Sequence, residues 1–173
     1  LGIVNTTNGV MATFAFIADL QPVDPRVLGF VTQSGAFGAI IYASSLHWGV
    51  GFNYFVSVGN EADLEFADFL DYMVHDRGTR LIGGYLEGAR DGDKLRRVAE
   101  EALAKEKPVL IMKVGRSSAG SRAAASHTGS LAGSDKIYDA FFKQTGIIRI
   151  DNYPDLIAFA PLFQAGKLPK GRN

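Results

Sequence analysis

The chain has 173 residues, enough for one domain with short flanking segments. Hydrophobic residues make up 47% and charged residues 21%, a globular composition that excludes an intrinsically disordered chain. Lys plus Arg and Asp plus Glu both number 18, so the formal net charge is zero and no basic block is available for nucleic acid or an anionic membrane. Cysteine is absent, which excludes disulfides in this chain and fits a reducing, cytoplasmic compartment.

The two ends of the chain do not resemble the middle. The chain starts with Leu1 rather than Met, and it ends in Leu-Pro-Lys-Gly-Arg-Asn, a sequence typical of a linker. We therefore expect a piece of a longer polypeptide, with a strand and linker at 1–27, a folded domain at 28–164 and a C-terminal linker at 165–173. No apolar run is long enough to cross a bilayer, so no membrane segment is predicted.

Short apolar runs alternate with helical segments through the middle of the chain. The predicted strands are 28–32, 54–58, 81–86, 108–112 and 147–150, and the predicted helices are 35–48, 64–75, 91–105, 134–144 and 153–163. Strands that are apolar throughout and alternate with helices are typical of a parallel sheet covered on both faces. The pattern predicts a flavodoxin-like, doubly wound α/β fold: three α/β/α layers around a five-stranded parallel sheet in the order 2-1-3-4-5.

Ligands of such a fold bind beyond the carboxyl ends of the strands, where strands one, three and four would be neighbours. Ser34 and Gly35 follow strand one and open a helix. Ser34 can cap that helix, and Gly35 lets a ligand approach the backbone, so the free N–H groups form an anion site. The alternative is a plain helix cap with small residues that serve packing.

Two further segments reach the same predicted edge. Glu87 follows strand three, where it is either a solvated loop residue or a site residue. The segment 115–133 after strand four is rich in Gly, Ser and Ala, and long loops of this kind in compact domains tend to be functional. It contains His127, whereas we expect His47 in the core or at its boundary and His75 on the surface.

These residues leave three functions open. In the first, neutral His127 attacks a phosphoryl group while Glu87 holds its other ring nitrogen as N–H. The helix that begins at Gly35 then receives the phosphoryl oxygens. In the second, Ser34 is the nucleophile of a serine hydrolase with His127 as its base, although the glycines that flank such a serine are missing. The third is a flavodoxin-like regulatory module without chemistry. With no cysteine and no second histidine near His127, no metal site is predicted.

Four motifs, in this order, resemble the NDP-forming acyl-CoA synthetases, the family of the ADP-forming acetate–CoA ligases and of the succinyl-CoA synthetase alpha subunit. The resemblance runs from about residue 1 to the end of the chain. The motifs are Thr-Gln-Ser-Gly-Ala-Phe-Gly at 32–38, Ser-Val-Gly-Asn-Glu-Ala-Asp at 57–63, Tyr-Leu-Glu-Gly at 85–88 and Ser-His-Thr-Gly-Ser-Leu-Ala-Gly at 126–133.

The resemblance implies a ping-pong ligase that interconverts acid, CoA and ATP with acyl-CoA, ADP and phosphate. His127 matches the phosphorylated histidine, Glu87 the carboxylate that orients it, and Asn60 lies in a segment near the acid. The residues expected to bind the phosphoryl group are Ser34, Gly35, Thr128 and Gly129.

The resemblance also implies partners. A CoA-binding Rossmann domain is expected before residue 1 and a nucleotide-grasp domain elsewhere, in the same chain or in another subunit of a homo- or hetero-oligomer. Coenzyme A, ATP or ADP, and a small carboxylic acid are the expected substrates, with Mg²⁺ accompanying the nucleotide in the missing domain. Some relatives fuse this module to a protein acyltransferase and lack the histidine, so His127 argues against a regulatory module of that kind.

Overall fold

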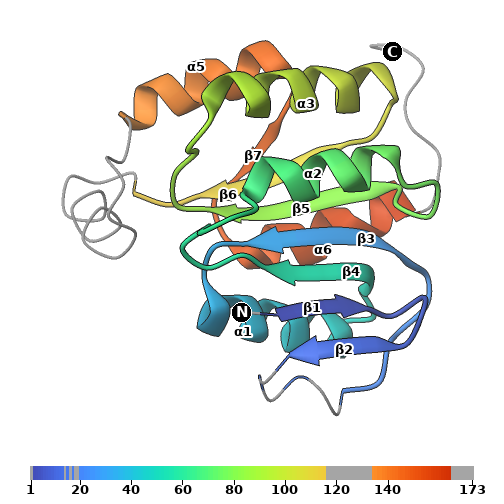
Figure 1. Cartoon of the computed structure of the whole chain (residues 1–173). Coiled ribbons are helices and arrows are strands. Elements are labelled where there is room, and N and C mark those ends of the chain that lie inside the picture. Colours follow the sequence, from blue (N-terminus) through green and yellow to red (C-terminus); the bar gives the residue numbers. More distant parts are fainter. Residues whose placement is uncertain (1, 14, 16, 18–19, 116–133, 165–173) are drawn as a thin grey trace.

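A computed structural model describes residues 2–13, 15, 17, 20–115 and 134–164 (Figure 1). The strands are β1 (Gly2–Asn5), β2 (Val10–Thr13), β3 (Arg26–Thr32), β4 (Gly51–Ser57), β5 (Leu81–Leu86), β6 (Val109–Lys113) and β7 (Ile148–Ile150). The helices are α1 (Gly35–His47), α2 (Phe66–His75), α3 (Gly92–Ala104), α5 (Asp135–Thr145) and α6 (Tyr153–Gln164). The described elements therefore follow the predicted alternation, with ends that differ by a few residues.

All the described strands form one sheet in the order β2-β1-β4-β3-β5-β6-β7. The five strands from β3 to β7 are parallel, and their order is the predicted 2-1-3-4-5. The flavodoxin-like topology is therefore confirmed.

The sheet is larger than the predicted five strands. The N-terminal segment, predicted as a single strand, forms the β1–β2 hairpin, and β1 pairs antiparallel with β4, with Ile3 opposite Val56. Since this hairpin continues the same sheet, the folded part of the chain begins before the predicted domain boundary at residue 28. Sequence alternation missed it because each of its two strands is only four residues long.

Helices cover both faces of the sheet (Figure 1). α2, α3 and α5 lie on one face and α1 and α6 on the other, and a separate group of buried side chains fills each side. Close packing explains two glycines of β5. A Cβ at Gly83 would lie 2.6 Å from the Phe30 ring, and a Cβ at Gly84 would lie 2.4 Å from the Phe66 ring.

Helix α1 differs from its prediction in one respect. His47 was expected in the core or at its boundary, but it is exposed, like Trp48, which is 69% exposed. The prediction was wrong because α1 is apolar on all sides, so composition alone does not show which side faces the sheet. Ile40 on the outer side is 48% exposed. No helix within the described ranges is long and apolar enough to cross a membrane.

Candidate functional site

The carboxyl ends of β3, β5 and β6 meet at one edge of the sheet, on the left in Figure 1. Thr32 of β3 lies opposite Tyr85 of β5, and Leu86 of β5 lies opposite Lys113 of β6. Ser34 and Glu87 leave the sheet within two residues of these positions. The parallel register therefore brings together the carboxyl ends of the three strands, as the sequence predicted.

Helix α1 begins at this edge with an open N-terminus. Ser34 caps it in the predicted way, because its hydroxyl accepts a hydrogen bond from the Phe37 N–H at 3.3 Å. The Thr32 hydroxyl holds the turn: it accepts from the Ser34 N–H at 3.0 Å and donates to the Ser34 carbonyl at 2.8 Å. Gly35 and Ala36 are exposed, and the first turn contains no acidic side chain. Within the described part of the chain, the N–H groups of Gly35 and Ala36 thus remain available to an anion.

The same geometry argues against the hydrolase alternative. A nucleophilic serine of that class sits on a strained strand-to-helix turn. Ser34 instead has ordinary extended backbone angles, φ −104° and ψ 116°, and its hydroxyl is engaged as a helix cap.

Gln33 joins α1 to the end of β5. Its side-chain oxygen accepts hydrogen bonds from the backbone N–H groups of Glu87 at 2.5 Å and of Gly88 at 3.1 Å. Its side-chain nitrogen donates to the Gly88 carbonyl and to the Glu61 carboxylate, both at 2.8 Å. One buried amide therefore satisfies four polar groups and fixes the position from which Glu87 projects.

Glu87 is buried rather than solvated. Its side chain is only 8% exposed, and its Oε2 atom is buried without a hydrogen-bond partner among the described residues. A buried carboxylate oxygen without a partner is costly, and such atoms in native proteins call for an explanation. The arrangement leaves Glu87 able to accept a hydrogen bond from a group that enters the site.

A second buried carboxylate lies behind Gln33. Glu61 is 4% exposed, and its Oε1 atom also accepts from the Phe66 N–H at 2.8 Å, at the start of α2. Burial raises the pKa of Glu61, and the hydrogen bonds from Gln33 and Phe66 only partly oppose this effect. Glu61 has a φ of 55°, an unfavourable value for a residue with a side chain, and Arg90 donates to its carbonyl.

A buried lysine completes the edge. Lys113, 5% exposed, donates to the Val114 carbonyl, and its Nζ lies 4.5 Å from the centre of the Tyr138 ring. Burial lowers the pKa of the Lys113 amino group, while the carboxylates of Asp135 and Glu87 act in the opposite direction. The Lys113 amino group on β6 and the Glu87 carboxylate after β5 therefore interact electrostatically.

Arg149 ties together the two described ends that flank residues 116–133. Its guanidinium donates to the Lys113 carbonyl at 3.3 Å and to the Asp135 carboxylate at 2.5 Å. Tyr138, one turn into α5, accepts a hydrogen bond from the Ala89 N–H at 2.9 Å. The start of α5 is therefore anchored beside the ends of β5 and β6.

The remaining predicted site residues are placed as follows. His127, Thr128 and Gly129 lie outside the described residues. Asn60 lies on an exposed turn, directly before the buried Glu61. The sequence analysis did not identify Gln33, Glu61 and Lys113 as residues of this edge. The available signal for Lys113 was a charged residue at the end of an otherwise apolar strand.

One cluster with metal-ligand chemistry occurs in the described part of the chain, away from this edge. Donor atoms of Asp71, His75 and Glu101 lie within 4.8 Å of one another. Asp71 and His75 lie in the second half of α2, and Glu101, on α3, is also paired with Lys105 at 2.9 Å. Exposed His75 confirms the surface position predicted for it.

The family described as succinyl-CoA ligase-like flavodoxin domain matches residues 25–163. The alpha subunit of an ADP-forming acetate–CoA ligase II from Pyrococcus furiosus is 44% identical over 173 residues. A 4-hydroxybutyrate–CoA ligase (ADP-forming) from Nitrosopumilus maritimus is 38% identical over 170 residues. The chain is covered almost entirely in both, at 100% and 98%, but spans only 36% and 24% of their lengths.

A solved structure shows the same fold. It is a dinucleotide-forming acetyl-coenzyme A synthetase 1 from Ca. Korarchaeum cryptofilum, in complex with phosphate and ADP. It superposes with a TM-score of 0.88 at 36% identity, covering 98% of this chain and 36% of that one.

Proposed function

The chain belongs to the family of succinyl-CoA ligase-like flavodoxin domains, and from that premise we propose that it is the phosphohistidine-carrying domain of an NDP-forming acyl-CoA synthetase. The observation that carries the proposal is the buried carboxylate of Glu87, whose Oε2 atom lacks a partner at the edge where α1 presents free N–H groups. A carboxylate and an anion site are the two groups that a phosphorylated histidine needs.

The proposed reaction has three transfers. A ring nitrogen of His127 attacks the terminal phosphorus of ATP, and ADP leaves. A carboxylate oxygen of the acid then takes the phosphoryl group, which frees the histidine and forms an acyl phosphate. The thiolate of CoA attacks the acyl carbon, the bond between that carbon and the bridging oxygen breaks, and inorganic phosphate leaves with this oxygen. Each step is reversible, so the enzyme also makes ATP from acyl-CoA.

The described residues serve these steps electrostatically. Glu87 accepts a hydrogen bond from the second ring nitrogen, which leaves the first free to attack and stabilises the positive ring of the intermediate. A phosphoryl group carries about −1.5 to −2 charges, and a helix N-terminus stabilises an anion by about 2 kcal/mol at most. The α1 N-terminus is therefore not sufficient alone, and Lys113 and groups from a partner supply the rest.

The partners follow from the length of the relatives, of which this chain spans about a third or less. We infer that CoA-binding and nucleotide-grasp domains act on the same histidine, in the same chain or in another subunit. Mg²⁺ would accompany the nucleotide in the latter domain. The names of the two relatives specify acetate and 4-hydroxybutyrate, so the acid differs within the family, and we expect a small carboxylic acid here.

Labelled ATP tests the proposal. The complete enzyme, incubated with γ-labelled ATP, should acquire phosphate that is labile in acid and stable in base. His127→Ala should abolish this label, whereas His47→Gln and His75→Gln, at exposed positions, should keep it. Acid-labile phosphate on His127→Ala enzyme would refute the assignment, and labelling by a serine-directed fluorophosphonate would favour the hydrolase.

A further inference from the structure

The helices on the two faces of the sheet differ in charge (Figure 1). On one face, α2, α3 and α5 all carry charged residues, and some of these pair between helices, as Lys94 of α3 does with Asp68 of α2 at 2.6 Å. On the other face, α1 has no Asp, Glu, Lys or Arg, and α6 has only Asp155. The outer sides of α1 and α6 therefore lack the charges that meet water on α2, α3 and α5.

Large apolar side chains occupy these outer sides instead. They are Ile40 of α1, Trp48 at its C-terminal end, and Phe159 and Leu162 of α6, all of them exposed. Single exposed apolar residues are normal on a protein surface, but a helix that is apolar on all sides is typical of the interior of a larger structure. We call the surface defined by these four residues the α1–α6 face, and we expect it to be covered.

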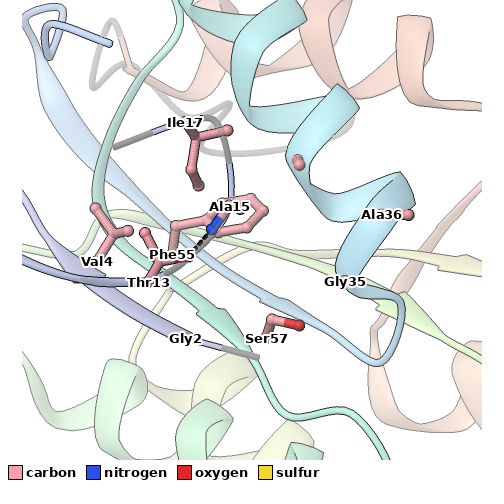
Figure 2. A pocket seen from close by; sticks show the side chains of 10 residues that line it. Gly2, Val4, Thr13, Ala15, Ile17, Gly35, Ala36, Phe55 and Ser57 are labelled. Carbon is pink, nitrogen blue, oxygen red and sulfur yellow. Dashed lines mark hydrogen bonds between the residues drawn. The ribbon is translucent and has the colours of Figure 1, made fainter. Parts of the chain in front are cut away.

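The described chain covers only the inner sides of the two helices. Towards the sheet, Tyr42 of α1 belongs to a buried apolar group, and a cavity of about 330 Å³ separates α1 from the β1–β2 hairpin (Figure 2). The helices approach each other near their starts, where the ring centres of Phe37 and Tyr153 lie 6.1 Å apart. Among the described residues, the four of the α1–α6 face belong neither to the buried group nor to the side chains packed against it.

We propose that the α1–α6 face is the docking surface for another domain of the same polypeptide, one with an apolar and largely uncharged surface of its own. The inference rests on the proposed function only in taking this chain as one domain of a longer enzyme. In two relatives the chain matches 36% and 24% of the polypeptide, so most of each polypeptide lies outside the matching region. Each of these relatives therefore carries further chain that can supply the cover.

A domain in the same polypeptide suits this face better than a separate chain does. An uncovered apolar patch favours aggregation, so the cover has to persist at any protein concentration. A short linker holds a tethered domain at an effective concentration in about the millimolar range, however dilute the protein is. Permanent interfaces of this kind are also more apolar than transient ones. A charge on the partner would lose its water here without gaining a counter-charge, so the partner surface must be apolar too.

Helix α1 connects the α1–α6 face to the candidate site. Ala36, at the open N-terminus of α1, lies four positions before Ile40, and residues at this spacing share one side of a helix. Both residues are exposed. A domain that docks on Ile40 therefore also borders the N-terminus at which the phosphoryl group needs further stabilising groups.

Thiol labelling of the complete enzyme tests the cover, because residues 1–173 contain no cysteine of their own. Ile40→Cys and Leu162→Cys place a thiol on the α1–α6 face. Leu103→Cys is the matched control, because Leu103 is 59% exposed and Leu162 64%, and both lie near the end of their helix. Reaction with a maleimide is followed by mass spectrometry of the peptide that carries the new cysteine.

We expect Ile40→Cys and Leu162→Cys to react at least about tenfold more slowly than Leu103→Cys in the native enzyme, because their thiols are reached only when the domains separate. All three should react at similar rates in urea. If either thiol of the α1–α6 face reacts as fast as the control in the native enzyme, the face is not covered and the inference is overturned.

Photo-crosslinking identifies the occupant. Benzoylphenylalanine in place of Trp48 should, on irradiation, form a bond to a peptide outside residues 1–173, in a product that keeps the mass of one chain on a denaturing gel. A product with the mass of two chains would assign the face to a second copy or another subunit and overturn the inference, as would the absence of any product. Neither readout depends on phosphorylation, so failure of this inference is distinct from failure of the proposed function.

Discussion

The side-chain oxygen of Gln33 lies 2.5 Å from the backbone nitrogen of Glu87, a residue 54 positions away. The contact joins the start of α1 to the end of β5, so it fixes the backbone of Glu87 relative to the N-terminus of α1. The same amide also binds Gly88 and Glu61.

Loss of this amide should disturb both stability and activity. Gln33→Leu leaves the N–H groups of Glu87 and Gly88 without their partner, and a buried unsatisfied group costs about 1–3 kcal/mol. We expect the free energy of unfolding, measured by urea denaturation, to fall by at least that amount, together with slower phosphorylation. Gln21→Leu, the same change at an exposed position, should have neither effect. Wild-type stability in Gln33→Leu would contradict the bridging role.

Glu87→Gln distinguishes an effect of Glu87 on the histidine from an effect on folding. The amide oxygen still accepts a hydrogen bond, but the negative charge that stabilises the positive ring is lost. Loss of the hydrogen-bond partner that orients a histidine lowers affinity or activity by about 10–100-fold in metal sites. We expect histidine phosphorylation, measured by rapid quench, to slow by a factor of that order. The urea midpoint should change little. Glu100→Gln, an exposed counterpart, should phosphorylate at the wild-type rate, and an equal rate in Glu87→Gln would remove Glu87 from the mechanism.

Glu61→Gln should show a specific pH dependence of stability. Burial raises the pKa of Glu61 in the folded state, so the ionised carboxylate costs stability above that raised pKa. The cost disappears as the pH falls below the ordinary carboxyl pKa of 4.5, where both states are protonated. The variant keeps an acceptor for Phe66 and avoids the charge. Its urea midpoint should therefore gain on the wild type at pH 7 and lose that gain at pH 4.

Asp68→Asn should change stability in the opposite direction to Glu61→Gln at neutral pH. The hydrogen bond from Lys94, at 2.6 Å, lowers the pKa of the Asp68 carboxyl. The ionised form therefore contributes stability at neutral pH, which is lost as the pH falls through the lowered value. Asp68→Asn should destabilise at pH 7 and less so at low pH. If the urea midpoints of the two variants changed with pH in the same direction relative to the wild type, burial of the Glu61 charge would not be the cause.

Lys113→Met tests the charge beside Glu87. Burial lowers the pKa of Lys113, so keeping it charged at neutral pH costs stability, and an apolar replacement is often neutral or stabilising by about 1–4 kcal/mol. We expect an unchanged or higher melting temperature with phosphorylation slowed about tenfold or more. Lys143→Met at an exposed position is the control. Unchanged phosphorylation would make Lys113 purely structural.

The sequence by itself determined the elements and their order in the parallel sheet. Apolar runs and helix caps depend on near neighbours in the chain, which explains why Ser34 caps α1 with the predicted hydrogen bond. The strand order followed because parallel strands joined by helices allow few topologies. The motifs indicated the family on the same local basis.

Only the tertiary structure decided how the site is built. Gln33, Glu61 and Glu87 are brought into contact across 28 to 54 positions of the chain, and no local pattern encodes which of them is buried. Burial then sets their chemistry, because the loss of water shifts the pKa of Glu61 and Lys113 in opposite directions. The pairing of β1 with β4 and the cavity beside α1 have the same origin, since both depend on which surfaces meet when the sheet forms.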